Sequence, residues 1–387
     1  MAYEIKFDNT PAGVCVEAVR NGGTAKVCAI EFVSEEDGDI LIERLEGFGS
    51  DILAKLPANP PIQPKQVQHL LAIIRRDGTA TVYVNELNTV GMMQVKRDLK
   101  KGDGVFADDI ADVHRLEFEG LTIPKDAGIL YIFAVGWRRA LFYDFLPLLP
   151  KNQKEREYDI GAQLAQFYAY LMFQRRFKIT DQEWKNLFDG QWFPFITLKE
   201  ATIRNLISYA TNCWPLDDLA EAIAQEVRDI LPSLLARWKT APGFTDHMPF
   251  LEKAVERYIS KDFMSTAAIL YPRIEGLLRS HQNQTDPTAP ASQKGLSESA
   301  TKKAESERHA NTPLLPAKFR EYLKSVYFAA FDPSAPKIRV SRNSVGHGVA
   351  AAEECSLKAS TISLLLVDQL CYCFSRASTK VAASPSK

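Results

Sequence analysis

The sequence lacks an excess of charge of either sign. Its 47 lysine and arginine residues stand against 48 aspartate and glutamate residues, which gives a formal net charge of −1. No overall positive field therefore exists to attract nucleic acid to the chain. If the protein acts on RNA, the contact must be local and confined to a small part of its surface.

Long apolar runs are also missing. No stretch approaches the roughly 18 to 20 consecutive apolar residues that a membrane-spanning helix requires. The first residues, MAYEIKFDNT, contain no basic segment followed by an apolar one, which argues against a secretory signal. We therefore expect a cytoplasmic protein that has no membrane partner.

Cysteine is scarce and scattered. Only Cys371 and Cys373 lie close together among the six cysteines, inside the apolar stretch Ile362 to Phe374. Buried, reduced thiols are the usual state of such residues in a cytosolic protein. No second cysteine or histidine pair at ligand spacing accompanies them, so we predict no metal site and no cofactor.

What is present divides the chain into two halves of different periodicity. Residues 1–150 carry strand-like segments, and the pairs Asn21-Gly22 and Asp77-Gly78 suit tight turns between antiparallel strands. One helix is expected after Ser34, because Ile40, Leu41, Leu45 and Phe48 follow at helical spacing. The strand-like segments are Ala25 to Phe32, Val67 to Arg75, Thr79 to Val84, His114 to Phe118 and Ile129 to Val135.

The second half, residues 151–387, follows a proline-containing tract at Leu146 to Lys154 and has helical periodicity. The expected helices include 160–171, a helix opened by a capping box at Thr180, 198–213 and 219–234. Residues 282–313 are poor in large apolar side chains, which predicts a disordered insertion. The fold class is therefore α+β: a β-rich domain followed by an all-α helical bundle domain.

The most informative segment is Val340 to Ala350, which reads VSRNSVGHGVA. In a helix, Asn343 and His347 share a face because they are four residues apart, whereas Arg342 lies off that face and must fold back or stand at the helix start. The unperturbed pKa of histidine, near 6.5, suits His347 to proton transfer at neutral pH. The planar fork of Arg342 fits two phosphate oxygens.

A second pattern lies upstream, in Ala267 to Arg279 (AAILYPRIEGLLR). Glu275 and Arg279 are four residues apart in an expected helix, and the simplest interpretation is an intrahelical ion pair. A role in lining the site is the alternative. A local kink at Pro272 would aim Glu275 toward the segment that carries Arg342.

Together these two patterns resemble the HEPN (higher eukaryotes and prokaryotes nucleotide-binding) family. Its hallmark is an arginine, a polar residue, a few more residues and a histidine, and a subset has an upstream Pro-x-x-Glu-x-x-x-Arg helix. The resemblance implies a metal-independent endoribonuclease that works as a homodimer through its helical domain. It assigns acid–base chemistry to His347, phosphate binding to Arg342 and positioning to Asn343.

The resemblance further implies a toxin-like or antiviral defence effector, released by a protein or nucleic-acid trigger that residues 1–150 would sense or recruit. The alternative is a non-catalytic module for dimerisation or for binding a nucleotide or RNA, in which Arg342 and His347 hold the ligand or the interface. A nuclease acting on DNA is less consistent with the sequence, which lacks the clustered carboxylates that hold divalent metal.

Overall fold

The computed structural model describes residues 2–35, 48–149, 155–331 and 339–375. The helix expected after Ser34 lies mostly outside these residues. The chain forms two compact units, one of residues 1–92 and 115–172 and the other of residues 93–114 and 173–387. This division differs from the expected boundary at residue 150, because the helix that follows the boundary tract belongs to the first unit.

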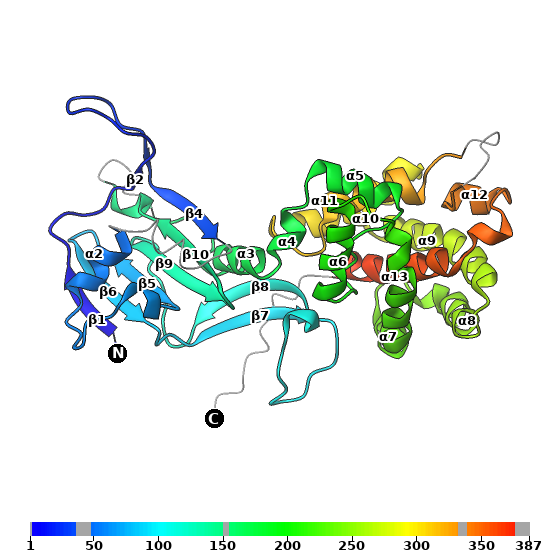
Figure 1. Cartoon of the computed structure of the whole chain (residues 1–387), viewed down its shortest axis with the longest axis horizontal. Helices are drawn as coiled ribbons and strands as arrows, with labels where there is room; N and C mark the ends of the chain where they lie inside the picture. The colour runs from blue at the N-terminus through cyan, green and yellow to red at the C-terminus, as the bar shows by residue number, and fades with distance from the viewer. Residues whose placement is uncertain (1, 36–47, 150–154, 332–338, 376–387) are drawn as a thin grey trace. The chain divides into compact units, whose positions relative to one another are not determined.

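The first unit is built on a six-stranded antiparallel sheet with the strand order β1-β6-β5-β9-β10-β4 (Figure 1). The turn between β5 and β6 contains Gly78 at a φ of +81°, as the Asp77-Gly78 pair predicts. The strands are β1 (Ala2–Lys6), β4 (Ile30–Glu35), β5 (Leu70–Ile74), β6 (Thr79–Val84), β9 (Gly128–Val135) and β10 (Arg138–Asp144).

Both faces of this sheet are buried. Along β5, Leu70 and Ile74 face a core shared with α2 (Phe48–Lys55), whereas Leu71 and Ile73 face a core shared with α3 (Ile160–Met172). The alternation follows from the two-residue period of a strand. The two helices therefore cover opposite faces, and all five residues of β5 are buried. A separate small ribbon pairs β2 (Val14–Cys15) with β3 (Val27–Cys28).

The second unit is helical around one large core. The capping box at Thr180 is confirmed at the start of α5, and α6 ends before Pro215 as predicted. The helices are α4 (Gln174–Phe177), α5 (Asp181–Asp189), α6 (Glu200–Thr211), α7 (Ala220–Thr240), α8 (Met248–Ile259), α9 (Phe263–Thr285), α10 (Gln293–Glu307), α11 (Pro316–Tyr322), α12 (Arg342–Gly346) and α13 (Leu357–Phe374). Strands in the first half and helices in the second confirm the α+β class.

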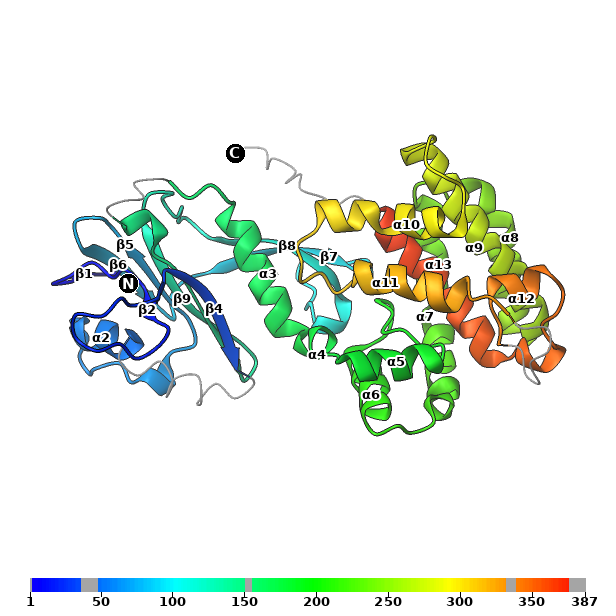
Figure 2. The same ribbon diagram turned by 90° about the horizontal axis from the view of Figure 1, so that it is seen from above.

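The C-terminal helix α13 is the centre of this core and packs against α7, α9 and α10 (Figure 2). It carries Cys371 and Cys373, which are buried and free as expected. By length and composition α13 is apolar enough to cross a membrane, yet 89% of it is buried inside the structure. Such burial is consistent with the central helix of a soluble protein.

The segment 282–313 corrects the prediction of a disordered insertion. Helix α9 extends to Thr285 and α10 occupies Gln293–Glu307. Small side chains explain the error: Leu296, Ala300 and Ala304 are buried in α10, together with the hydroxyl residues Ser297 and Thr301. A helix that packs closely through small residues needs few large apolar side chains, so its composition resembles that of a disordered segment.

The hairpin formed by β7 (Thr89–Val95) and β8 (Ile110–Phe118) contributes residues 93–114 to the second unit. Asp112 is fully buried there in an ion pair with Arg308, which follows α10. Arg308 also donates to the carbonyl of Tyr372 at 3.2 Å. On the other side of the hairpin, Arg237 donates to the carbonyl of Lys96 at 2.8 Å. The hairpin tip is thus an integral part of the helical unit.

Candidate active site

The sequence around Arg342 forms a single short helix, α12. Ser341 is its N-cap: the Ser341 hydroxyl accepts from the backbone N–H of Ser344 at 3.1 Å, and the Ser344 hydroxyl accepts from the N–H of Ser341 at 2.8 Å. Gly348, at a φ of +69°, follows the last turn. A reciprocal cap at the start and a left-handed glycine after the end confine the helix to Arg342–Gly346.

The sequence predicts that Arg342 either stands at the helix start or folds its side chain back, and the structure shows both. Arg342 is the first residue of α12, and its side chain also folds back along the helix. An ideal Cβ added at Gly346 would lie 3.4 Å from Nη1 of Arg342. The guanidinium therefore rests beside Gly346, the residue before His347, and glycine leaves room for it there.

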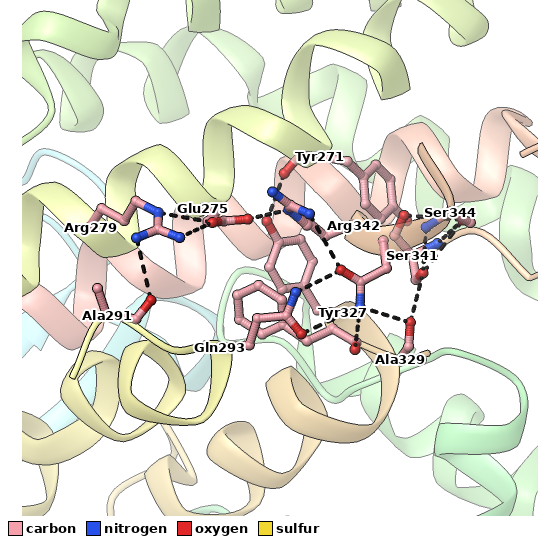
Figure 3. Close-up of polar contacts among 12 residues, drawn as sticks. Tyr271, Glu275, Arg279, Ala291, Gln293, Tyr327, Ala329, Ser341, Arg342 and Ser344 are labelled. Carbon is pink, nitrogen blue, oxygen red and sulfur yellow. Dashed lines mark hydrogen bonds and ion pairs between the residues drawn. The ribbon is translucent and has the colours of Figure 1, made fainter. Parts of the chain in front are cut away.

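Glu275 joins the two sequence patterns into one cluster (Figure 3). One oxygen of its carboxylate forms an ion pair with Nε of Arg342, while the other accepts two hydrogen bonds from Arg279, at 2.6 and 2.9 Å. The ion pair expected between Glu275 and Arg279 is confirmed. Helix α9 continues through Pro272 from Phe263 to Thr285. Glu275 of α9 is thus the contact between this helix and the start of α12.

The carboxylate of Glu275 is shielded from solvent, with a side-chain exposure of 7%, whereas Arg342 is 28% exposed and Arg279 46%. Tyr327 is buried near this pair and donates its hydroxyl to the carbonyl of Tyr271 at 2.6 Å. Burial raises the pKa of Tyr327, and the charge of Glu275 raises it further, while Arg342 opposes the shift. The surroundings are therefore poorly hydrated, which strengthens the attraction between Glu275 and Arg342.

Asn343 is held by hydrogen bonds on both sides of its amide. Its Nδ2 donates to the carbonyls of Phe328 at 2.9 Å and Ala329 at 3.3 Å. Its Oδ1 accepts from Nε2 of Gln293 at 2.6 Å. The side chain therefore fixes the position of α12 relative to the elements around it.

His347 lies at the C-cap of α12, and its backbone N–H donates to the carbonyl of Asn343 at 3.0 Å. Its ring lies near that of Phe331, with 5.7 Å between the ring centroids. Among the six histidines it is the exposed one; the other five are buried or half-buried. Burial lowers the pKa of His69, His114 and His247, and that of His281 to about 4. His347 is therefore the histidine that is most accessible to solvent.

The structure links four of the five residues that the sequence singled out through side-chain contacts, and it places the fifth, His347, at the end of the same short helix with its ring against Phe331. Arg342, Asn343 and His347 share α12 and its cap, Glu275 of α9 contacts Arg342, and Arg279 contacts Glu275. Sequence reasoning missed Gln293, since its segment was expected to be disordered. One local signal was available: Ser292 stands at the N-cap of α10, where its hydroxyl accepts from the N–H of Gly295 at 3.1 Å.

Within the part of the chain that the structure describes, no group of three or more histidine, cysteine, aspartate or glutamate side chains is arranged to hold a metal ion. Comparisons of the chain with protein-family models, with curated proteins and with solved structures gave no match.

Proposed function

We propose that the protein is an endoribonuclease of the HEPN type that cleaves RNA without metal at a site containing Arg342, Asn343 and His347. The observation that carries the proposal is the contact of Glu275 with Arg342. It joins the two patterns on which the family resemblance rests, although α9 and α12 are far apart in the sequence. In this proposal the helices of the second unit form the HEPN-like bundle.

The proposed reaction is attack of a ribose 2′-oxygen on the adjacent phosphorus. The 2′-O–P bond forms, the P–5′-O bond breaks, and the products are a 2′,3′-cyclic phosphate and a free 5′-hydroxyl. One histidine takes the 2′-OH proton and another gives a proton to the leaving 5′-oxygen. His347 is exposed and suits either task. A single copy of His347 performs one of them, so a homodimer that brings two copies together completes the site.

The charges at the cluster also support phosphate binding. Two arginines, Arg342 and Arg279, share the single carboxylate of Glu275, so the three groups carry a formal net charge of +1. Because Glu275 contacts Arg342 through Nε, the carboxylate fixes the guanidinium from one side. In this role Glu275 orients Arg342, and the remaining positive charge attracts a phosphodiester.

One observation favours the second candidate, a non-catalytic module for dimerisation or for nucleotide or RNA binding. Arg342 is already paired with a buried carboxylate, and Asn343 is bonded to backbone carbonyls. Both contacts would serve equally well to fix α12 as an interface element. In that case His347 would contribute to binding but would transfer no proton.

Cleavage of labelled RNA in EDTA tests the proposal. We expect the wild-type protein to cut, with 2′,3′-cyclic phosphate ends, and both His347→Ala and Arg342→Ala to lose at least about 100-fold in rate, as expected for loss of an acid–base or transition-state contact. Arg204→Ala is the control, because Arg204 is an exposed arginine of α6.

Two further results would separate the candidates. A wild-type dimer that binds RNA but never cuts it, with or without cell or phage lysate as a trigger, would favour the binding module. Cutting that EDTA abolishes would contradict the metal-independent mechanism. The oligomeric state is measured by analytical ultracentrifugation on the same samples.

A further inference from the structure

The amide of Asn343 has only one workable orientation. Its Nδ2 faces the carbonyl oxygens of Phe328 and Ala329, which accept hydrogen bonds but cannot donate them. A rotated amide would place Oδ1 against these two oxygens and lose both bonds. Oδ1 must therefore face α10, where Nε2 of Gln293 donates to it at 2.6 Å; Nη1 of Arg342 donates to the same oxygen at the longer distance of 3.4 Å.

Gln293 is itself held in place by the segment that leads into α10. Gln282 donates to the carbonyl of Pro290 at 3.1 Å, and Ser292 caps the helix by accepting from Gly295. The segment turns so tightly that a Cβ at Gly295 would lie 2.1 Å from the carbonyl oxygen of Pro290. Gln293 therefore presents its amide from a fixed backbone.

The two polar residues at the start of α12 thus have separate anchors. Glu275 of α9 holds Arg342, and Gln293 of α10 holds Asn343. A helix of five residues has little stability of its own, so these side-chain contacts set its orientation. They also determine where its C-terminal end presents His347.

We infer that Gln293 is a positioning residue of the site, acting on the reaction through Asn343; this inference rests on the proposed ribonuclease function. Gln293 does not contact the substrate. It holds the Oδ1 end of the Asn343 amide, whose orientation the two carbonyls set, and through it the angle at which α12 presents Arg342 and His347. Helix α10 is therefore part of the functional unit rather than a spacer between the two sequence patterns.

The test compares Gln293→Ala and Gln293→Met with a matched control, Gln182→Ala. Gln182 makes the same kind of contact elsewhere: it donates to Oδ1 of Asn186 at 2.9 Å, and Nδ2 of Asn186 donates to the carbonyl of Ala210 at 2.9 Å. We expect both Gln293 variants to lose about tenfold in kcat, the value of one hydrogen bond, with little change in KM. Gln182→Ala should cleave like the wild type.

The decisive measurement is a double-mutant cycle with Asn343→Ala. If Gln293 acts through Asn343, then Gln293→Ala has almost no further effect on kcat when Asn343 is already alanine. Unfolding curves of each variant show whether the fold is intact, and Gln293→Met keeps the side-chain volume if alanine disturbs α10.

The outcomes distinguish the inference from the function on which it rests. A wild-type protein that does not cleave RNA means that the proposed function fails, and the inference falls with it. A wild-type protein that cleaves, with Gln293 variants no slower than Gln182→Ala, overturns the inference alone. Equal losses from Gln293→Ala in the presence and absence of the Asn343 side chain would also overturn it.

Discussion

Glu275 contacts two arginines, Arg342 and Arg279, and we expect its interaction with Arg342 to be the stronger one. Replacing Glu275 by glutamine removes the charge that faces both Arg342 and Arg279 but keeps the size of the side chain. The contact with Arg342 joins a carboxylate that is 7% exposed to an arginine that is 28% exposed. A charge-assisted contact with this degree of burial contributes about 2 kcal/mol.

The contact with Arg279 is weaker, even though its geometry is good. Arg279 is 46% exposed and lies four residues from Glu275 in the same helix. Pairs of this kind contribute about 0.5 kcal/mol, because water screens them and the side chains lose freedom. We therefore expect Glu275→Gln to lower the free energy of unfolding by about 2 to 3 kcal/mol, mostly through Arg342.

Urea unfolding followed by tryptophan fluorescence measures this loss in the right part of the molecule. Four of the five tryptophans lie in the second unit, at positions 184, 192, 214 and 238, so the signal reports mainly on the helical unit. Double-mutant cycles of Glu275→Gln with Arg342→Ala and with Arg279→Ala separate the two couplings. Glu221→Gln is the control, since Glu221 pairs with Arg228 on the surface and is 74% exposed.

The reasoning would be refuted by equal couplings of Glu275 to the two arginines. It would be refuted equally by a loss of stability no larger than that of Glu221→Gln. Either result would mean that the contact between α9 and α12 is a surface contact and does not hold the motif helix.

Two further predictions concern the same helices. Burial, together with Lys303, lowers the pKa of His281 to about 4, below the unfolded value of 6.5, so the unfolded chain binds the proton more tightly. The free energy of unfolding should therefore fall by about 3 kcal/mol as the pH drops from 6.5 to 4. The variant His281→Phe keeps the ring stack on Phe374 and should reduce this pH dependence in unfolding curves. An unchanged pH dependence would show that His281 is not its cause. The variant Gly295→Ala places a Cβ against the carbonyl of Pro290 and should destabilise the helical unit by about 1 to 3 kcal/mol in thermal unfolding. The control Gly104→Ala should be close to neutral, because its Cβ would meet only the ring of Phe106 at 3.4 Å.

Local patterns in the sequence were enough to predict many of the elements. The apolar run of β5, the Asp77-Gly78 turn and the capping box at Thr180 each depend on residues close together in the chain. Strands β1, β2, β7 and β10 were missed, and so was the strand order. These depend on pairings between distant segments, such as β1 with β6 and β10 with β4, which no local period encodes.

The same difference between local patterns and contacts of distant segments applies to the candidate site. The sequence identified Arg342 with His347, and Glu275 with Arg279, because each pair lies within one local pattern. The contact of Glu275 with Arg342 is tertiary; the sequence suggested only, from Pro272, that Glu275 would point toward the segment that carries Arg342. Gln293 was missed for a different reason: α10 buries small and hydroxyl side chains, so its composition carries little apolar signal.

The hairpin tip at residues 93–114 makes the helical unit discontinuous in sequence, since the chain passes from one unit to the other after Met92, His114 and Met172. A gene fragment that starts at Phe173 would encode a helical unit without Asp112, in which Arg308 would be buried without its carboxylate. Conversely, a protease cut after Met172 would leave the hairpin seated among the helices. The two halves are therefore not interchangeable modules, and recombination at this boundary would not produce an independent helical domain.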